Sequence, residues 1–193
     1  IAVSGTHGKS TTTAMLALLL VKAGLDPTVI VGTKIKEFGD GNCRVAASER
    51  RASPKGRGKS RYLVIEADEH FASFLNYWPK IIILTRIEAD HLDFFKNFQN
   101  YTAAFKKFVS HLPKDGILAA NKDDKNIYNT FSTIVRNVLW YSLNNKESKK
   151  LKKILKVPGE HNISNALAAL AVGRVLKIPD KISFKALSEY RGS

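Results

Sequence analysis

The first twelve residues, IAVSGTHGKSTT, constrain the fold of this chain more than any other segment. A short apolar run comes first, a glycine-rich turn follows, and Lys-Ser then opens an apolar helical stretch. Gly5 and Gly8 let the backbone turn sharply, so that successive N–H groups can point at an anion. Lys9 adds a mobile positive charge, and the Ser10 hydroxyl suits the Mg²⁺ that accompanies a nucleoside triphosphate. The segment therefore predicts a phosphate-binding loop between a strand and a helix.

This loop is shorter than the common P-loop, in which the first glycine stands five residues before the second. Val3 occupies that earlier position here, so the pattern is G-T-H-G-K-S. A glycine turn that caps a helix beside an incidental lysine is the alternative interpretation. Nucleotide binding predicts that Lys9 lies at a surface anion site rather than in the core. The residues expected to contact the nucleotide are Gly5, Thr6, His7, Gly8, Lys9, Ser10 and Thr11.

The composition is that of a folded chain with an excess of positive charge. The 193 residues are 44% apolar, which is enough for a core and suggests a single domain. The formal net charge is +14, and much of it lies in two runs: Arg50, Arg51, Lys55, Arg57, Lys59 and Arg61, then Lys146, Lys149, Lys150, Lys152, Lys153 and Lys156. Neither run contains an aromatic residue that could stack on bases. We therefore expect a loop and a solvated helix face, with no specific nucleic acid partner, although a basic, nucleotide-regulated nucleic-acid-binding module is the alternative from another functional class.

Cysteine content and hydropathy indicate a cytoplasmic protein. The single cysteine, Cys43, excludes an internal disulfide and suits a reducing compartment. The longest apolar run, residues 14–21, is far shorter than the roughly 20 residues that span a bilayer, and no signal-peptide pattern opens the chain. We therefore expect no membrane insertion. Because Ile1 already lies in a predicted strand, we also expect the chain to be a fragment of a longer protein.

Short apolar runs alternate with helical patterns along the chain, which is typical of an α/β fold with a mostly parallel sheet and flanking helices. Strands are expected at residues 1–4, 28–31, 61–66, 80–85, 116–120 and 136–141. Helices are expected at residues 10–23, 101–111, 122–131, 161–176 and 183–190. Residues 34–60 interrupt this order with glycines and charges, and they predict a hairpin or an irregular excursion.

Acidic residues and a histidine follow two of these strands at their carboxyl ends, where open parallel sheets bind ligands. A carboxylate opposite Ser10 would complete a Mg²⁺ site, and Glu66 is the candidate. His91 suits a second divalent site that also tolerates Mn²⁺, or a hydrogen bond to phosphate; a turn histidine satisfied by the backbone is the alternative. Asp68 and Glu69 are explained by the preference for acidic residues where a helix starts.

The segment GEHNISNA, which begins at residue 159, opens a helix with polar side chains in its first turn. His161 and Asn165 are four residues apart and share a helix face. An imidazole that can stack and an amide that can donate and accept suit the plane and the edge of an adenine. Asn162 belongs to the same candidate site, although helix capping explains it equally well.

Four motifs together resemble the Mur ligase family: G-T-H-G-K-S-T-T-T, E-A-D-E followed by S-F-L, I-E-A-D-H-L-D, and G-E-H-N-I-S-N-A-L-A-A. The resemblance spans nearly the whole chain and implies the family's central ATPase domain, with a P-loop NTPase-like fold. Within the family, His7 and the E-A-D-E-x-x-x-S-F-L segment are most similar to the branch that joins L-alanine to UDP-N-acetylmuramate in peptidoglycan synthesis. The branch that reattaches murein peptides and the folylpolyglutamate synthetase-like enzymes are the alternatives.

The resemblance implies ATP-driven amide formation through an acyl phosphate, with ATP and Mg²⁺ or Mn²⁺ as cofactors. It implies that Lys9 contacts the β- and γ-phosphates, that Ser10 and Glu66 hold one metal ion, and that Glu66 and His91 hold a second. In these terms Lys9, Glu66 and His91 are the catalytic residues. The residues implied to lie near the adenine and ribose are His161, Asn162 and Asn165.

The resemblance also implies that residues 1–193 form one ATP-binding domain, without the family's N-terminal UDP-binding domain and its C-terminal domain for the amino acid. The isolated chain is therefore expected to ligate nothing. Two positions depart from the family pattern: Arg86 stands where T-N-x-x-x-D-H has asparagine, and Phe71 replaces an acidic residue. Arg86 either adds a phosphate contact or marks a diverged or impaired enzyme.

Overall fold

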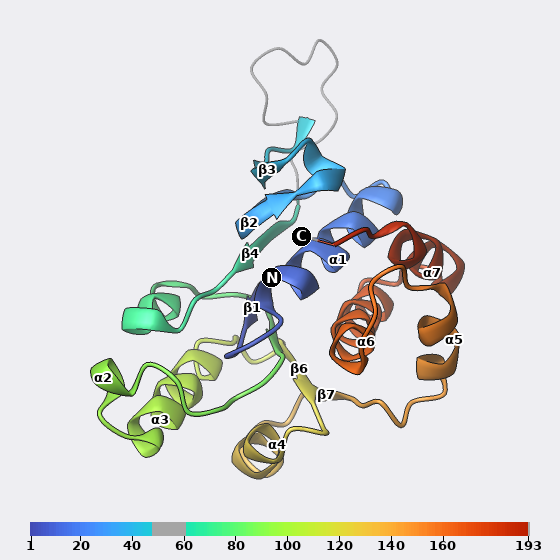
Figure 1. Ribbon diagram of the computed structural model, residues 1–193. Coiled ribbons are helices and arrows are strands. Elements are labelled where there is room, and N and C mark those ends of the chain that lie inside the picture. The colour runs from blue at the N-terminus through green and yellow to red at the C-terminus, as the bar shows by residue number, and fades with distance from the viewer. Residues whose placement is uncertain (48–60, 193) are drawn as a thin grey trace.

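A seven-stranded sheet forms the centre of the computed structural model, which describes residues 1–47 and 61–192 (Figure 1). The strand order is β3-β2-β4-β1-β5-β6-β7, and every neighbouring pair is parallel except β2 and β3. The strands are β1 Ala2–Ser4, β2 Thr28–Ile35, β3 Gly41–Arg44, β4 Leu63–Glu66, β5 Ile81–Leu84, β6 Ile117–Asn121 and β7 Val138–Tyr141. The predicted α/β fold with a mostly parallel sheet is confirmed.

Helices cover both faces of the sheet. The helical segments are α1 Lys9–Lys22, η1 Lys36–Phe38, η3 His70–Asn76, α2 Leu92–Phe95, α3 Phe98–Val109, α4 Lys125–Phe131, α5 Glu147–Ile154, α6 Glu160–Val175 and α7 Asp180–Glu189. Helices α1, α5, α6 and α7 pack together on one face, whereas η3, α3 and α4 lie on the other (Figure 1). In the described ranges 1–47 and 61–192, no helix combines the length and apolar character that a membrane crossing requires.

Successive side chains of each strand point to opposite faces of the sheet, so the core has two parts, one on each face. In β5, Ile81 and Ile83 point to the α1 and α6 side, while Ile82 and Leu84 point to the α3 side. The first part is mostly aliphatic, although it includes Tyr141, Phe184 and Tyr190. The second part is richer in aromatic side chains, namely Phe74, Phe95, Tyr101, Phe105, Phe108 and Phe131. Because β5 is buried on both faces, its sequence is a continuous apolar run rather than an alternating one.

The predicted elements are present, with shifts at their ends that have local causes. Asn97 caps α3 by accepting a hydrogen bond from the backbone N–H of Asn100, so this helix starts three residues before the predicted Tyr101. Asp124 caps α4 in the same way, so that helix starts later than predicted. The expected hairpin is the antiparallel β2 and β3 pair. Of the basic run in the expected loop, Arg50, Arg51, Lys55, Arg57 and Lys59 lie outside the described residues.

The carboxyl ends of β1, β4 and β5 meet at one edge of the sheet because these three strands are adjacent and parallel. The glycine-rich loop leaves β1 at that edge and leads into α1. The two acidic segments predicted from the sequence leave β4 and β5 beside it. The fold therefore brings the predicted motifs into one region.

Candidate active site

Hydrogen bonds hold the glycine-rich loop against the segment that follows β5. The Thr6 N–H donates to the Arg86 carbonyl at 2.8 Å, and the Thr85 hydroxyl donates to the His7 carbonyl at 2.6 Å. Gly5 has a φ of +133°, and a Cβ atom there would lie 2.4 Å from the Thr85 hydroxyl oxygen. Only glycine fits this position. The loop conformation is therefore fixed by hydrogen bonds to Thr85 and Arg86 and by the close approach at Gly5.

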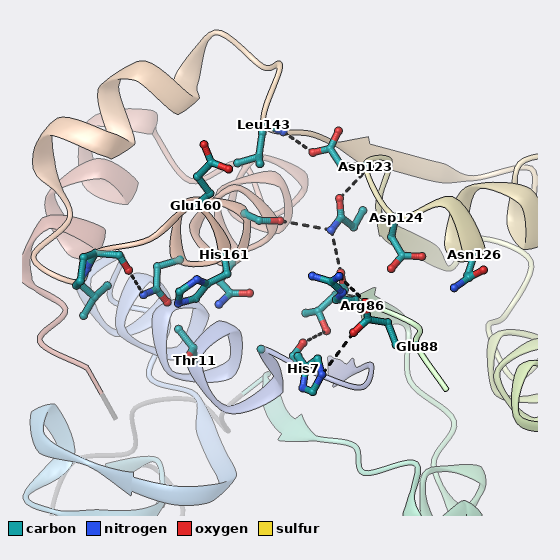
Figure 2. Close-up of a pocket in the computed structure, with 18 of the residues that line it drawn as sticks. His7, Thr11, Arg86, Glu88, Asp123, Asp124, Asn126, Leu143, Glu160 and His161 are labelled. Carbon is teal, nitrogen blue, oxygen red and sulfur yellow. Dashed lines mark hydrogen bonds and ion pairs between the residues drawn. The ribbon is translucent and has the colours of Figure 1, made fainter. Parts of the chain in front are cut away.

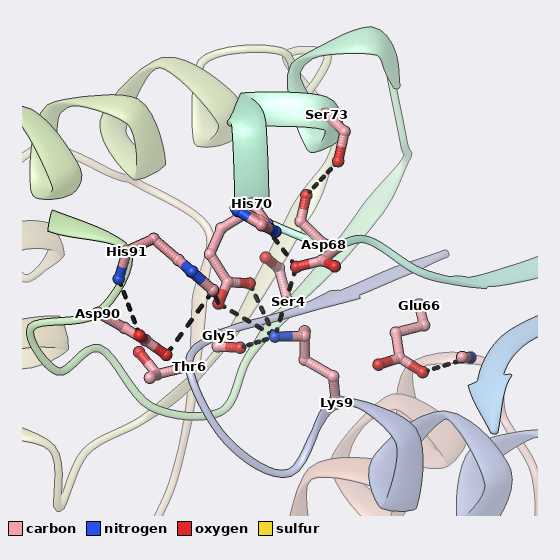
Figure 3. Close-up of polar contacts among 12 residues, drawn as sticks. Ser4, Gly5, Thr6, Lys9, Glu66, Asp68, His70, Ser73, Asp90 and His91 are labelled. Atoms are coloured by element: carbon pink, nitrogen blue, oxygen red, sulfur yellow. Dashed lines mark hydrogen bonds and ion pairs between the residues drawn. The ribbon is translucent and has the colours of Figure 1, made fainter. Parts of the chain in front are cut away.

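Lys9 lies inside the loop and is paired with a buried carboxylate (Figure 3). Its ammonium donates to the Gly5 carbonyl at 2.9 Å and to both carboxylate oxygens of Glu69, at 3.1 and 2.9 Å. The Lys9 side chain is 13% exposed and that of Glu69 is fully buried. Lys9 is therefore more buried than expected for a surface site, although it belongs to neither part of the apolar core. Glu69 does stand at the start of η3, as expected, but its side chain makes no capping hydrogen bond there and is paired with Lys9 instead.

Glu69 is the centre of a polar cluster below the loop. The Tyr101 hydroxyl donates to Glu69 at 3.4 Å and lies 3.0 Å from the Thr6 hydroxyl, while His91 Nε2 lies 4.0 Å from a Glu69 oxygen. Burial raises the pKa of the Tyr101 hydroxyl, and the Glu69 and Asp90 carboxylates raise it further. Tyr101 therefore stays protonated and available as a hydrogen-bond donor.

Ser10 and Glu66 face each other on the other side of Lys9. The Ser10 hydroxyl donates to one Glu66 oxygen at 3.0 Å, and the Gly32 N–H donates to the other at 2.7 Å. A Cβ atom at Gly32 would lie 3.1 Å from the Glu66 carboxylate, so the lack of a side chain there allows this close approach. A hydroxyl and a carboxylate are hard oxygen ligands of the kind that Mg²⁺ prefers. This pair therefore fits the predicted magnesium site.

His91 lies apart from Glu66. The carboxylates near its Nε2 atom are Asp90 at 3.7 Å and Glu69 at 4.0 Å. Among the described residues, Glu69, Asp90 and His91 are the three whose potential metal-ligand atoms all lie within 4.8 Å of one another. In Figure 3, Glu66 and His91 stand on opposite sides of the Lys9 ammonium. The His91 ring stacks on His70, with centroids 4.2 Å apart. The structure therefore brings His91 to Glu69 rather than into direct contact with Glu66.

A pocket of about 1090 Å³ opens on the opposite side of the loop (Figure 2). Six of the predicted nucleotide-binding residues line it: His7, Gly8, Thr11, His161, Asn162 and Asn165. Within the part of the chain that the structure describes, Lys9, Ser10, Glu66 and His91 do not line this pocket. The loop therefore separates two regions, the pocket and the Lys9 side.

Asn165, in α6, packs closely against the loop at Gly8. Gly8 has a φ of +83°, and a Cβ atom there would lie 2.5 Å from the Asn165 side-chain oxygen. Asn165 is 7% exposed, so its amide lies in the wall of the pocket rather than on the surface. The Asn162 side chain donates to the Pro158 carbonyl at 2.6 Å, and the N-cap of α6 is Gly159. N-capping of α6 therefore does not explain Asn162.

Glu69, Tyr101 and Arg86 complete the site and were not among the predicted site residues. Glu69 follows Glu66 by three positions in a short acidic run, and only its burial separates it from Asp68, which is 57% exposed. Tyr101 lies in an amphipathic helix, where its spacing indicates the core. Arg86 did carry a signal, because it departs from the family motif.

Comparison with protein families and curated proteins points to one family. Residues 3–155 match the model of the Mur ligase middle domain. The UDP-N-acetylmuramate–L-alanine ligase of Caldanaerobacter subterraneus subsp. tengcongensis is 36% identical over 216 aligned positions, and that of Caldicellulosiruptor saccharolyticus is 38% identical over the same length. Both alignments cover the whole chain, which spans 44% and 45% of these relatives.

Solved structures agree. The UDP-N-acetylmuramate:L-alanyl-γ-D-glutamyl-meso-diaminopimelate ligase from Neisseria meningitides has a TM-score of 0.84 at 25% identity, covering all of this chain and 66% of its own. The UDP-N-acetylmuramate-alanine ligase from Thermotoga maritima has a TM-score of 0.77 at 25% identity, covering all of this chain and 45% of its own. Since the family model covers most of the chain and curated relatives are more than a third identical over its full length, the chain belongs to the Mur ligase family.

Proposed function

We propose that this chain is the ATP-binding part of a ligase that joins L-alanine to UDP-N-acetylmuramate. The curated relatives quoted above carry that name, and they are about twice the length of this chain. The muramate substrate and alanine are therefore proposed as substrates of the longer protein, and ATP as the ligand of the part described here. The proposed compartment is the cytoplasm, and no specific nucleic acid is proposed as a partner.

The two regions beside the loop suit the two ends of ATP. The pocket offers the exposed His161 ring and the amides of Asn162 and Asn165 for the base and ribose. The backbone N–H groups of the loop and the N-terminus of α1 favour the phosphates. Lys9, which Gly5 and Glu69 hold in place, is proposed to contact the β- and γ-phosphates.

The oxygen atoms of Ser10 and Glu66 fit a magnesium ion, since they are hard donors only 3.0 Å apart at the start of α1. We propose that these residues hold one Mg²⁺, and that His91 belongs to a second metal site on the other side of Lys9, where the carboxylates beside it are those of Asp90 and Glu69. When bound, magnesium neutralises phosphate charge. Lys9 contributes positive charge from the protein itself, and Tyr101 keeps Glu69 oriented toward Lys9 by hydrogen bonding.

The proposed reaction has two steps. A carboxylate oxygen of the muramate substrate attacks the γ-phosphorus of ATP, the bond from that phosphorus to the bridging oxygen breaks, and ADP leaves. The alanine amino group then attacks the acyl carbon, loses a proton and expels inorganic phosphate, which forms the amide. Such phosphoryl transfer needs positioning and charge stabilisation rather than a protein nucleophile. Lys9 and the loop N–H groups provide both.

The observation that carries this proposal is the position of Lys9 and Ser10 at the start of α1, where Ser10 is hydrogen bonded to the last residue of β4, Glu66, and Lys9 to Glu69 just after it. The test is alanine ligation followed by mass spectrometry, with residues 1–193 alone and with the longer protein that has the remaining length of the relatives. The longer protein should form UDP-N-acetylmuramoyl-alanine, and the isolated chain should bind ATP but form none. Failure of the longer protein would contradict the function, and ligation by residues 1–193 alone would contradict the need for the remaining length.

Ligation of a murein peptide is the second candidate, because the Neisseria structure gives the higher TM-score of the two described above. The sequence relatives favour alanine, since both curated proteins described above are L-alanine ligases. The same assay distinguishes the two when L-alanine and the tripeptide L-alanyl-γ-D-glutamyl-meso-diaminopimelate are offered together at equal concentration. Formation of the tripeptide product alone would replace the first proposal by the second.

A further inference from the structure

Arg86 is held in a defined position beside the phosphate-binding loop. Its carbonyl accepts the Thr6 N–H at 2.8 Å, and the Thr6 hydroxyl accepts the Glu88 N–H at 3.0 Å. A Cβ atom at Gly5 would lie 2.9 Å from the Arg86 nitrogen, which shows how closely the two segments approach. The backbone of Arg86 is thus fixed, while its side chain is 53% exposed and lines the pocket (Figure 2).

The guanidinium of Arg86 is paired with the Glu88 carboxylate. The other Glu88 oxygen lies 3.5 Å from His7 Nε2, so this carboxylate stands between two groups that can carry positive charge. Glu88 is 42% exposed and His7 is 65% exposed. Ion pairs this exposed to solvent contribute little to stability. A ligand anion can therefore take the place of Glu88 at small cost.

The charges around the pocket make Arg86 important for a polyanion. Four carboxylates line the pocket: Glu88, Asp123, Asp124 and Glu160. The permanently charged cations of that lining are Arg86 and Lys125, and Arg86 is the one adjacent to the loop. Arginine also presents a planar fork of donors that matches phosphate oxygens. Without Arg86, the loop side of the pocket would present the Glu88 carboxylate to a phosphate chain with no permanently charged side chain of the described lining beside it to offset the repulsion.

We infer that Arg86 binds a phosphate group of the nucleotide and exchanges Glu88 for a phosphate oxygen when the nucleotide enters. Glu88 then acts as an internal competitor for Arg86. This inference rests on the proposed function, because it requires the phosphate chain to pass the pocket side of the loop. Nucleotide affinity also distinguishes the two interpretations of Arg86. If Arg86 contacts phosphate, its replacement should weaken nucleotide binding, whereas a residue that merely marked a diverged enzyme would not affect nucleotide affinity.

The test is calorimetric titration of the chain with adenosine, ATP and inorganic tripolyphosphate. Arg86→Gln should weaken ATP and tripolyphosphate about tenfold, since a charge-assisted hydrogen bond is lost, and should leave adenosine unchanged. Glu88→Gln should strengthen ATP binding about threefold, because the competitor is removed. Arg136→Gln is the matched control, since Arg136 is exposed and lies outside the pocket lining in the described chain. It should bind all three ligands as the wild type does.

The double variant Arg86→Gln/Glu88→Gln separates competition from simple repulsion. If Glu88 acts by occupying Arg86, the gain from Glu88→Gln should be clearly smaller when Arg86 is absent. If Glu88→Gln raises ATP affinity equally with and without Arg86, the proposed exchange of Glu88 for phosphate is wrong. If Arg86→Gln leaves ATP affinity unchanged, the proposed contact between Arg86 and phosphate is wrong. The proposed function has a different failure: a wild type that binds tripolyphosphate through Arg86 but neither adenosine nor ATP would have an anion site without nucleotide specificity.

Discussion

The two sides of the phosphate-binding loop use the same chemistry in opposite environments. On one side, Lys9 is paired with Glu69, with side chains 13% and 0% exposed. On the pocket side, Arg86 is paired with Glu88, with side chains 53% and 42% exposed. Both are pairs of a cation and a carboxylate next to one loop. They differ in their exposure to solvent: water can solvate Arg86 or Glu88 if the two separate, but it cannot reach the buried Glu69 carboxylate.

This difference indicates different roles. A buried charge whose partner is removed is strongly destabilising, so the Lys9 and Glu69 pair must stay together. An exposed pair costs little to separate, so Arg86 is free to exchange partners. The Lys9 side therefore fits fixed groups around reacting phosphates, where preorganised charge is most effective. The pocket side fits recognition of a ligand that binds and leaves.

The largest effect is expected for Lys9→Ala, which breaks the buried pair. It should lower the free energy of unfolding by about 3 to 5 kcal/mol, because Glu69 remains buried without its cation. Arg86→Ala, which breaks the exposed pair, should change it by less than about 1 kcal/mol. Urea denaturation of the chain followed by circular dichroism measures both values.

The double variant Lys9→Ala/Glu69→Gln tests the cause of that loss. A neutral amide in place of the carboxylate removes the unpaired charge, so stability should recover substantially from the single variant. If Lys9→Ala and Arg86→Ala lose equal stability, the contrast between the two sides of the loop is wrong. If the double variant recovers nothing, the loss arises from the side-chain packing of Lys9 rather than from its charge.

A smaller effect is expected for Tyr101→Phe, which removes one hydrogen bond from the buried cluster. The Tyr101 hydroxyl contacts Glu69 and Thr6, so the variant should lose about 1 to 1.5 kcal/mol at neutral pH. Because burial raises the pKa of Tyr101, the stabilisation is complete below about pH 10, the usual pKa of tyrosine, and is lost as the pH rises above it. The gap between wild type and variant should therefore narrow in alkaline solution.

Tyr128→Phe is the control for this experiment. Tyr128 is 42% exposed, so the loss of its hydroxyl should leave stability within about 0.5 kcal/mol of the wild type at every pH. Equal losses for the two variants would show that the Tyr101 hydroxyl has no special place in the cluster. A gap that widens above pH 10 would contradict the direction of the Tyr101 pKa shift.

The smallest effect is expected for His161→Ala, which changes only the pocket side. Loss of a ring that stacks on the base should weaken adenosine about fivefold, or about 1 kcal/mol, and leave tripolyphosphate unchanged. His111→Ala is the control, since His111 stacks on Trp78 and does not line the pocket in the described part of the chain. Weaker tripolyphosphate binding by His161→Ala would mean that base and phosphates are not recognised by separate residues.

Much of the fold could be predicted because its signals are local. The continuous apolar runs of β1 and β5 indicate strands buried on both faces, and Gly5 and Gly8 mark the turn that the loop requires. The family resemblance added the order of the motifs. Helix starts were missed where one capping side chain decides them, as Asn97 does for α3.

The candidate site could be predicted only in part, because burial depends on contacts between distant segments. Asp68 and Glu69 are neighbours in the sequence and both lie within 4 Å of the Lys9 ammonium, yet only the Glu69 side chain is buried and hydrogen bonded to it. Tyr101 contacts Glu69 from a helix that starts about 30 residues later. Pairing of Glu66 with His91 was expected from the motifs, whereas the carboxylates nearest His91 are Glu69 and Asp90. Neither result follows from spacing or charge.

The most direct test of this account is a crystal structure of the chain with Mn²⁺ and a non-hydrolysable ATP analogue, with the metal located by anomalous scattering. We expect the adenine in the pocket beside His161 and Asn165, and a Mn²⁺ peak at Ser10 and Glu66, at ligand distances of about 2.0 to 2.6 Å. A second peak should lie at His91. An adenine outside the pocket, or Mn²⁺ more than about 4 Å from both Glu66 and His91, would contradict the division of the site by the loop.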